Sequence, residues 1–108
     1  MVIPLVAVYA NGGAPRRRPV KNVNRSGAWI ETPDRWYPGT IVSMMFQYDP
    51  HYLQVARIAG DPAASIRMRA KVLRTEPAGI AVRFVYVDPQ ERGRFQKLLA
   101  GSEVRGAQ

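Results

Sequence analysis

The residues with the clearest capacity for chemistry lie between Arg16 and Gly27. Three consecutive arginines, Arg16, Arg17 and Arg18, precede the polar segment Asn22-Val23-Asn24-Arg25-Ser26-Gly27. Guanidinium groups bind phosphates and carboxylates through paired hydrogen bonds, and asparagine amides both donate and accept. Asparagine and glycine also favour tight turns, because they tolerate left-handed backbone geometry. The polar segment is therefore either a hairpin turn or a place that holds a phosphate-bearing ligand. The arginines are either its phosphate contacts or a solvated basic segment.

The balance of charge favours an anionic partner. The 108 residues include 16 Lys+Arg and 8 Asp+Glu, a formal net charge of +8, and most of the cations are arginine. With 46% hydrophobic and 22% charged residues, the composition is that of one folded domain. The absence of cysteine excludes disulfides, thiol catalysis and Cys-ligated zinc, and it fits a reducing compartment. No apolar run approaches the roughly 20 residues of a membrane-spanning helix, so no membrane insertion is expected.

The sequence offers little for catalysis. Its single histidine, His51, lies in an expected loop with no acid partner at a fixed spacing, which favours a surface histidine. No glycine-rich nucleotide motif occurs. We therefore expect no catalytic site, no metal site and no cofactor, and an enzyme that uses His51 is the least favoured alternative. The carboxylates are scattered, and several are typical of turns and caps: Asp34, Asp49, Asp61, Asp88 and Glu91.

Short strands must position the polar segment. Apolar, β-rich residues predict a strand over Ile3–Tyr9, and Asn11-Gly12-Gly13 should end it. Arg16–Asn22 and Ala28–Thr32 are predicted to be paired strands, with Asn24–Gly27 as the turn between them.

Two later segments alternate between apolar and polar side chains, as half-buried strands do. After a loop at 33–39, the strand Thr40–Tyr48 should bury Val42, Met44, Phe46 and Tyr48. The strand Ser65–Leu73 should bury Ile66, Met68, Ala70 and Val72 and present Arg67, Arg69 and Lys71 on its other side. This basic side is either solvated or a nucleic-acid surface, on which the candidates for base stacking are Trp29 and Trp36.

The last elements are a hairpin and a helix. A turn at Glu76–Gly79 leads to an inward row formed by Ile80, Val82, Phe84 and Tyr86. Asp88 as N-cap, Pro89 at the first helical position and Glu91 as capping-box partner predict a helix start. The helix should pack through Phe95, Leu98 and Leu99 and end near Gly101, before a flexible tail at 102–108. Between the Asp-Pro turns of 49–64, Val55–Ile58 is a possible edge strand.

These elements predict an all-β fold. Roughly five to seven short strands joined by hairpins, followed by one C-terminal helix, suit a small antiparallel barrel or a sandwich with a helix packed on it. Residues 1–101 are expected to form this one unit.

The order of the segments resembles a PilZ domain. VKNVNRSGAWIET (20–32), YPGTIVSMMF (37–46) and IRMRAKVLRTEPAGIAVRFVYVD (66–88) precede the capped helix PQERGRFQKLLAG (89–101). The resemblance implies a six-stranded antiparallel β-barrel of PilZ type with a C-terminal helix, in the bacterial cytoplasm. It also implies a role in second-messenger signalling, because many members bind cyclic di-GMP and others act on partner proteins.

The ligand motif of the family has two parts, [D/N]xSxxG and RxxxR. The first falls on 22–27, where Asn22 and Gly27 match and Asn24 replaces the serine. The RxxxR spacing is absent from the 108 residues, and Arg16–Arg18 follow the first strand instead of preceding it. The resemblance therefore implies a partly degenerate site and weak binding of cyclic di-GMP. Its candidate residues are Asn22, Asn24, Arg25 and Gly27, with Arg16, Arg17 and Arg18 as possible phosphate contacts.

The expected function is that of a regulatory or adaptor domain in cyclic di-GMP-linked signalling, which acts on a protein partner to control type IV pili, motility or exopolysaccharide. One alternative is a functional cyclic di-GMP receptor, completed by residues upstream of this chain or by Arg16–Arg18. An alternative of another class is a small barrel that binds nucleic acid, which the net charge and the basic strand favour.

Overall fold

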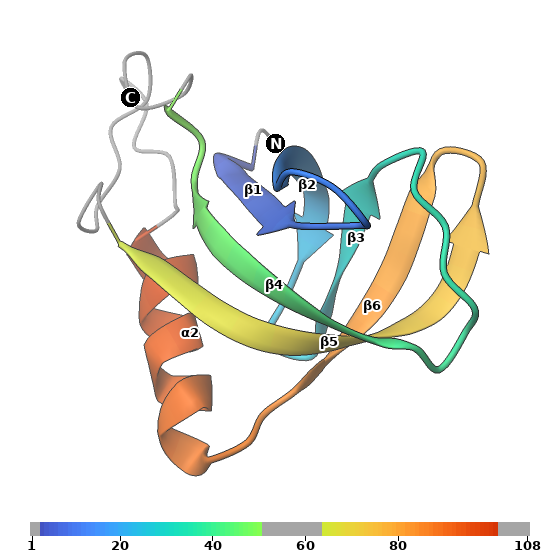
Figure 1. Cartoon of the computed structure of the whole chain (residues 1–108). Coiled ribbons are helices and arrows are strands. Elements are labelled where there is room, and N and C mark those ends of the chain that lie inside the picture. Colours follow the sequence, from blue (N-terminus) through green and yellow to red (C-terminus); the bar gives the residue numbers. More distant parts are fainter. Residues whose placement is uncertain (1–2, 51–63, 102–108) are drawn as a thin grey trace.

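Six antiparallel strands close into a barrel, and one helix lies against it (Figure 1). The computed structural model describes residues 3–50 and 64–101. The predicted edge strand at Val55–Ile58, His51 and the tail at 102–108 lie outside these residues. The elements are β1 (Leu5–Tyr9), β2 (Arg16–Val23), β3 (Gly27–Glu31), β4 (Ile41–Tyr48), β5 (Ser65–Glu76), β6 (Gly79–Val85) and α2 (Pro89–Gly101).

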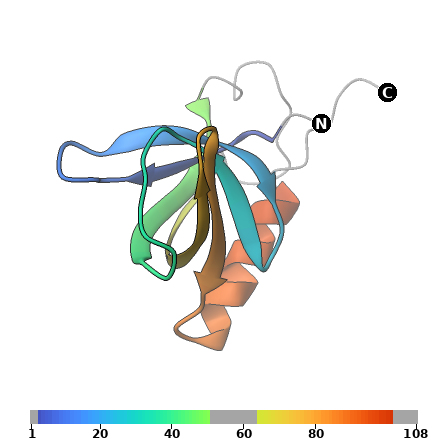
Figure 2. The same cartoon turned by 90° about the vertical axis from the view of Figure 1, so that its right-hand side faces the viewer.

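The barrel closes because β1 pairs on both of its sides. It is hydrogen-bonded to β2 along one side and to β4 along the other, which gives the strand order β1-β2-β3-β6-β5-β4. The hairpin of β1 and β2 projects from the barrel and away from α2 (Figure 2). The predicted six-stranded antiparallel barrel with a C-terminal helix is therefore confirmed.

The predicted alternation of buried and exposed side chains is confirmed in β4 and β5. In β4 the expected inward residues Val42, Met44, Phe46 and Tyr48 are buried, and in β5 so are Ile66, Met68, Ala70 and Val72. Their outward neighbours are more exposed, because successive side chains of a strand point to opposite faces.

Two register shifts interrupt the ladders, and the sequence pattern does not reveal them. The pairing of β2 with β3 shifts between Val20 and Asn22, and that of β5 with β6 shifts between Val72 and Arg74. Each inserts one extra residue, as in a β-bulge, and so changes which side chains face outward beyond it. In β5 the strand continues past the bulge to Glu76, three residues beyond the predicted end.

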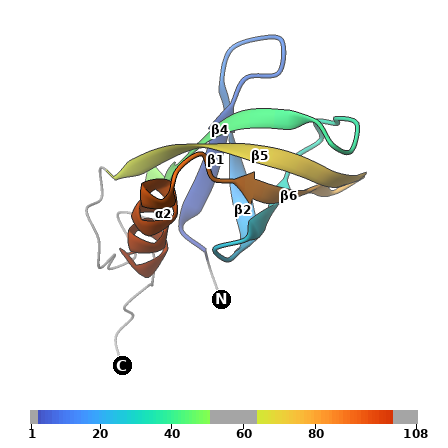
Figure 3. The same ribbon diagram turned by 90° about the horizontal axis from the view of Figure 1, so that it is seen from below.

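The helix α2 starts as predicted and lies against one end of β5 (Figure 3). The backbone N–H of Glu91 donates to Oδ1 of Asp88 at 3.0 Å, and the N–H of Asp88 donates to Oε2 of Glu91 at 3.3 Å. This reciprocal pair is a capping box. Phe95 is buried against Phe84 and Phe46, with ring centroids 4.7 and 5.7 Å away in edge-to-face contacts, so one aromatic cluster joins helix and barrel.

One predicted core position is confirmed only in part, because Tyr86 packs against the core from outside the strand. Tyr86 was expected in the inward row of the last strand, but β6 ends at Val85 and Tyr86 is only partly buried. The chain leaves the sheet there to reach α2. The ring of Tyr86 contacts Phe84, while its hydroxyl donates to the backbone carbonyl of Arg25.

Candidate functional site

The segment Asn22–Gly27 spans the end of β2, the turn at 24–26 and the first residue of β3. Oδ1 of Asn24 accepts hydrogen bonds from the backbone N–H groups of Ser26 and Gly27, at 2.8 and 3.1 Å. The N–H of Asn24 donates to the carbonyl of Gly27 at 3.0 Å. The turn itself therefore occupies the carbonyl end of the Asn24 side chain, and its amide NH₂ is the end that suits a ligand acceptor.

Hydrogen bonds join this turn to the end of β6 and to the residue that follows it. The backbone N–H of Phe84 donates to the carbonyl of Ser26 at 2.9 Å, and the hydroxyl of Tyr86 donates to the carbonyl of Arg25. Because two consecutive carbonyls are held from the same side, the turn has a fixed shape before any ligand arrives. Such preorganisation lowers the entropy cost of binding.

Gly27 is required for a reason other than the expected one. Left-handed geometry was expected to explain the glycine, but within 3–50 and 64–101 a positive φ occurs only at Gly12 and Gly39. A Cβ added at Gly27 would lie 2.2 Å from the carbonyl oxygen of Val82. Close approach of β3 to β6 therefore excludes any side chain at this position.

A shallow hollow of about 290 Å³ lies beside the turn. Asn22, Asn24 and Trp29 line it from β2, the turn and β3, and two cations, Arg74 and Arg83, line it from β5 and β6. The guanidinium of Arg74 lies 5.9 Å from the ring centroid of Trp29 and also pairs with Glu76 at 3.1 Å. Amides, an indole and two guanidinium groups together suit a planar, anionic ligand.

The arginine cluster lies far from this hollow. Arg16 begins β2, whereas the turn follows its last residue. Asn24 lies seven positions after Arg17, which in a strand corresponds to roughly 23 Å. Strand alternation also divides the three arginines. Arg16 and Arg18 pair with the inward residues Tyr9 and Ala7, while Arg17 pairs with Val8 and points outward.

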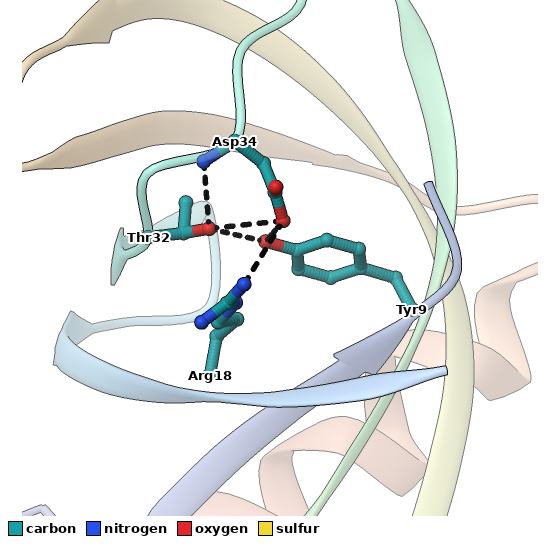
Figure 4. A network of polar contacts seen from close by, with 4 residues as sticks. All are labelled: Tyr9, Arg18, Thr32 and Asp34. Atoms are coloured by element: carbon teal, nitrogen blue, oxygen red, sulfur yellow. Dashed lines mark hydrogen bonds and ion pairs between the residues drawn. The ribbon is translucent and has the colours of Figure 1, made fainter. Parts of the chain in front are cut away.

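Arg18 belongs to a polar network at the other end of the barrel (Figure 4). Its Nη2 lies 3.6 Å from Oδ2 of Asp34. The hydroxyl of Tyr9 is 2.9 Å from the same oxygen and 2.7 Å from Oγ1 of Thr32, and it can donate its one proton to either. Thr32 in turn donates to Asp34 at 3.1 Å. This network fixes the segment after β3 to β1 and β2.

The environment of this network shifts the pKa of Tyr9 and that of Asp34. Burial raises the pKa of Tyr9 to about 12, with the nearby carboxylate of Asp34 acting in the same direction. Burial alone would raise the pKa of Asp34, but hydrogen bonds from Tyr9 and Thr32 and the charge of Arg18 hold it below its ordinary value. Nε and Nη2 of Arg18 are buried without a hydrogen-bond partner. The ion pair with Asp34 therefore shows that Arg18 is directed into this network and not toward the hollow.

The comparison with known protein families agrees with this architecture. Residues 2–101 match the PilZ domain, which is nearly the whole chain. The chain belongs to the PilZ domain family. No curated protein matches it. PilZ domains are receptor and adaptor domains without catalytic activity, and membership links this chain to cyclic di-GMP signalling.

The structure brings together some of the PilZ candidates and separates the others. Asn22, Asn24 and Gly27 line one hollow, with Arg25 in the same turn. Arg16, Arg17 and Arg18 lie at the opposite end of β2. Sequence reasoning missed Arg74 and Arg83. Alternation along β6 would have placed Arg83 outward, but its position beside Gly27 depends on the pairing of β3 with β6.

The described part of this PilZ domain offers neither a membrane helix nor a metal cluster. Over residues 3–50 and 64–101, the helix is too short and too polar to cross a bilayer. Across the same residues, no three histidine, cysteine or carboxylate side chains gather as metal ligands would.

Proposed function

We propose that this PilZ domain is an adaptor in cyclic di-GMP-linked signalling that acts through a protein partner and binds the nucleotide itself only weakly. The output would be control of type IV pili, motility or exopolysaccharide. The observation that carries the proposal is the separation between the turn of the first motif and the arginine cluster Arg16–Arg18. Hydrogen bonds to the Asn24 side chain hold the turn in shape. The arginine cluster lies at the other end of β2, and Arg18 pairs with Asp34.

The missing contacts have a predictable cost. RxxxR does not occur in the 108 residues, so these residues do not supply its two arginine contacts to the ligand. Hydrogen bonds to charged groups contribute about 1.5 to 3 kcal/mol each, hence roughly 3 to 6 kcal/mol for two. At about 1.4 kcal/mol per tenfold change, this weakens binding by about two to four orders of magnitude. A micromolar site would become one of about 0.1 mM or weaker.

The second candidate is a functional cyclic di-GMP receptor. Arg16–Arg18 give it little support, since they would have to reach along the whole of β2. The specific observation in its favour is the pair of cations at the hollow, Arg74 and Arg83. Arg74 already contacts Glu76 and Trp29, so Arg83 is the better placed of the two to receive a phosphate.

Titration calorimetry with cyclic di-GMP separates the candidates. The chain, Asn22→Ala/Asn24→Ala and Arg83→Ala would be compared, with Arg94→Ala on the exposed side of α2 as a control for lost positive charge. We expect a dissociation constant of about 0.1 mM or weaker for the chain. A low micromolar constant that the double substitution abolishes and Arg94→Ala leaves unchanged would refute the weak-site proposal and establish the receptor.

A further inference from the structure

The outer face of β1, β4 and β5 combines apolar residues with a series of exposed cations. Cross-strand pairing places Arg17, Val8, Met45 and Arg67 in one row over four strands, from β2 through β1 and β4 to β5. Along β5 the cations recur at every second residue, as Arg67, Arg69 and Lys71, which we call the basic row. On β4, Ser43 lies beside Arg69 and Ile41 beside Lys71.

An apolar hollow opens on this face. It has a volume of about 620 Å³ and lies between the β1–β2 hairpin, the segment before β4 and the outer side of β4. We call it the outer groove. Ile41 is 50% exposed, and the partly buried Val8 and Met45 continue the apolar floor. The lining includes Val8, Pro15, Trp36, Ile41, Met45 and Arg67.

The basic row has no ion-pair partner among the residues that the structure describes. Among residues 3–50 and 64–101, none of Arg67, Arg69 and Lys71 forms an ion pair, whereas Asp34, Glu31 and Glu76 each pair with another cation. Lys71 also lies directly across from Arg83 on β6. Like charges directly opposite on neighbouring strands cost stability, and an external anion over them would remove that cost.

We infer that the outer groove and the basic row form the docking surface for an acidic amphipathic helix of a partner protein. The apolar side of such a helix would lie on Val8, Ile41 and Met45, and its carboxylates would meet the basic row. The inference rests on the adaptor role proposed above and names the chemistry of its partner.

The closed barrel favours a helix over an extended peptide as the bound segment. An extended peptide commonly binds by adding a strand to an open sheet edge. Here the strands pair on both sides over most of their length, and the stretches with one free side are short, such as 41–44 of β4 and 16–19 of β2. A longer extended segment would therefore leave most of its backbone groups without partners. A helix satisfies its own backbone. Its residues four apart are separated by about 6 Å, close to the roughly 6.8 Å between alternate residues of a strand such as β5.

The aromatic residues argue against single-stranded nucleic acid as the occupant. Base stacking needs open ring faces. Tyr9 and Trp36, which line the outer groove, pack edge to face against each other at 5.1 Å, and Tyr9 is 3% exposed. Tyr37 is exposed but does not line the groove. The apolar floor therefore suits aliphatic side chains of a helix better than bases.

A displayed library of random helical peptides tests the inference without a known partner. Peptides of about 16 residues span about 24 Å, close to the length of the eight-residue β4. Selection on the full chain should enrich sequences with an apolar stripe flanked by Asp or Glu at spacings of three and four. Fluorescence anisotropy then gives the affinity of a labelled, enriched peptide.

Paired variants identify the surface. Arg67→Glu/Arg69→Glu should weaken binding of the enriched peptide by about tenfold or more, because attraction becomes repulsion. Ile41→Ser should weaken it about three- to tenfold through the apolar floor. The matched control Arg25→Glu/Arg92→Glu makes the same charge change on exposed positions of the β2–β3 turn and the start of α2, which do not line the outer groove. It should leave binding within about twofold. Circular dichroism confirms that each variant is folded.

Three outcomes would overturn the inference. One is the enrichment of peptides without acidic residues, and another is equal binding to the chain and to Arg67→Glu/Arg69→Glu. The third is that single-stranded DNA, or phosphatidylglycerol vesicles, bind to Arg67 and Arg69 more tightly than any enriched peptide does. The result is separable from the nucleotide proposal. Asn22→Ala/Asn24→Ala leaves the outer groove intact, so peptide binding can fail or succeed whatever the calorimetry with cyclic di-GMP shows.

Discussion

At the scale of single residues, Gly27 shows how one atom can matter to a fold. Its missing Cβ allows β3 to approach the carbonyl of Val82, where an alanine Cβ would lie at 2.2 Å. A contact that short requires backbone of β3 or β6 to move. The glycine of the ligand motif therefore has a structural role that exists without any ligand.

We predict opposite effects for two glycine substitutions. Gly27→Ala should lower the free energy of unfolding by about 1 to 3 kcal/mol, because the added methyl group overpacks the sheet. Gly93→Ala is the control, since nothing lies within 4 Å of its added Cβ and it is inside α2. It should raise stability by about 0.5 to 1 kcal/mol through helix propensity. Urea denaturation measures both, and equal effects of the two changes would contradict this account of Gly27.

Tyr9 gives a prediction for alkaline pH. Folding raises its pKa from 10.0 to about 12, so the folded state prefers the neutral phenol. Its contribution to stability is complete below about pH 10, where both states are protonated. As pH rises from about 10 to about 12 the unfolded chain releases this proton first, and up to about 2 kcal/mol of stability is lost.

Tyr9→Phe isolates this effect. The variant should be less stable at neutral pH, since the hydroxyl no longer bonds Thr32 and Asp34, but its stability should decline less steeply between about pH 10 and 12. Tyr37→Phe is the control, because Tyr37 is 88% exposed and should leave the slope unchanged. Parallel pH profiles for the chain and Tyr9→Phe would show that Tyr9 does not titrate as described.

At the scale of elements, the parts that sequence predicts are those in which one face is buried along a whole strand. In β4 and β5 the alternation is regular, so their inward residues were predicted individually. The capping box of α2 was predicted because its partners are three residues apart. Local pattern carries the information in both cases.

Features that depend on pairing could not be predicted. The bulges near Lys21 and Leu73 arise from the register between two strands, which no single strand encodes. The same holds for the candidate site. Three adjacent arginines suggest one cluster, but alternation and register direct Arg18 inward to Asp34 and leave Arg17 outside. Arg83 reaches the hollow only through the pairing of β6 with β3.

The junction of β6 and α2 yields a prediction at the same scale. Phe84 is 5% exposed, and its ring meets those of Phe46 and Phe95 at 5.4 and 4.7 Å. Phe84→Ala should cost about 3 to 5 kcal/mol, from lost burial and the cavity left at the helix contact. Val85→Ala, on the outward side of the same strand, should cost less than about 1 kcal/mol. Thermal and urea denaturation compare the two, and a cost below about 1 kcal/mol for Phe84→Ala would be inconsistent with the aromatic junction.

At the scale of the whole molecule, excess positive charge and the closed barrel act together. The net charge is +8, and the exposed basic row leaves part of it concentrated on β5. The closed barrel offers only short stretches of free sheet edge to another chain, so we expect recognition to use mainly side chains of its outer face. Repulsion among these cations lowers the stability of the isolated domain and is available to favour an acidic partner.

This view predicts that salt stabilises the domain. Raising NaCl from about 10 mM to about 150 mM shortens the Debye length from about 30 Å to about 8 Å, which screens the repulsion. The free energy of unfolding in urea should therefore increase by several tenths of a kcal/mol to about 1 kcal/mol. Arg67→Glu/Arg69→Glu and Arg25→Glu/Arg92→Glu each lower the net charge from +8 to +4, since every change removes two units. If the basic row is the main source of repulsion, the first pair abolishes more of the salt dependence than the second. If the free energy of unfolding of the unaltered chain falls with salt, attraction between opposite charges outweighs repulsion. The basic row then does not destabilise the domain.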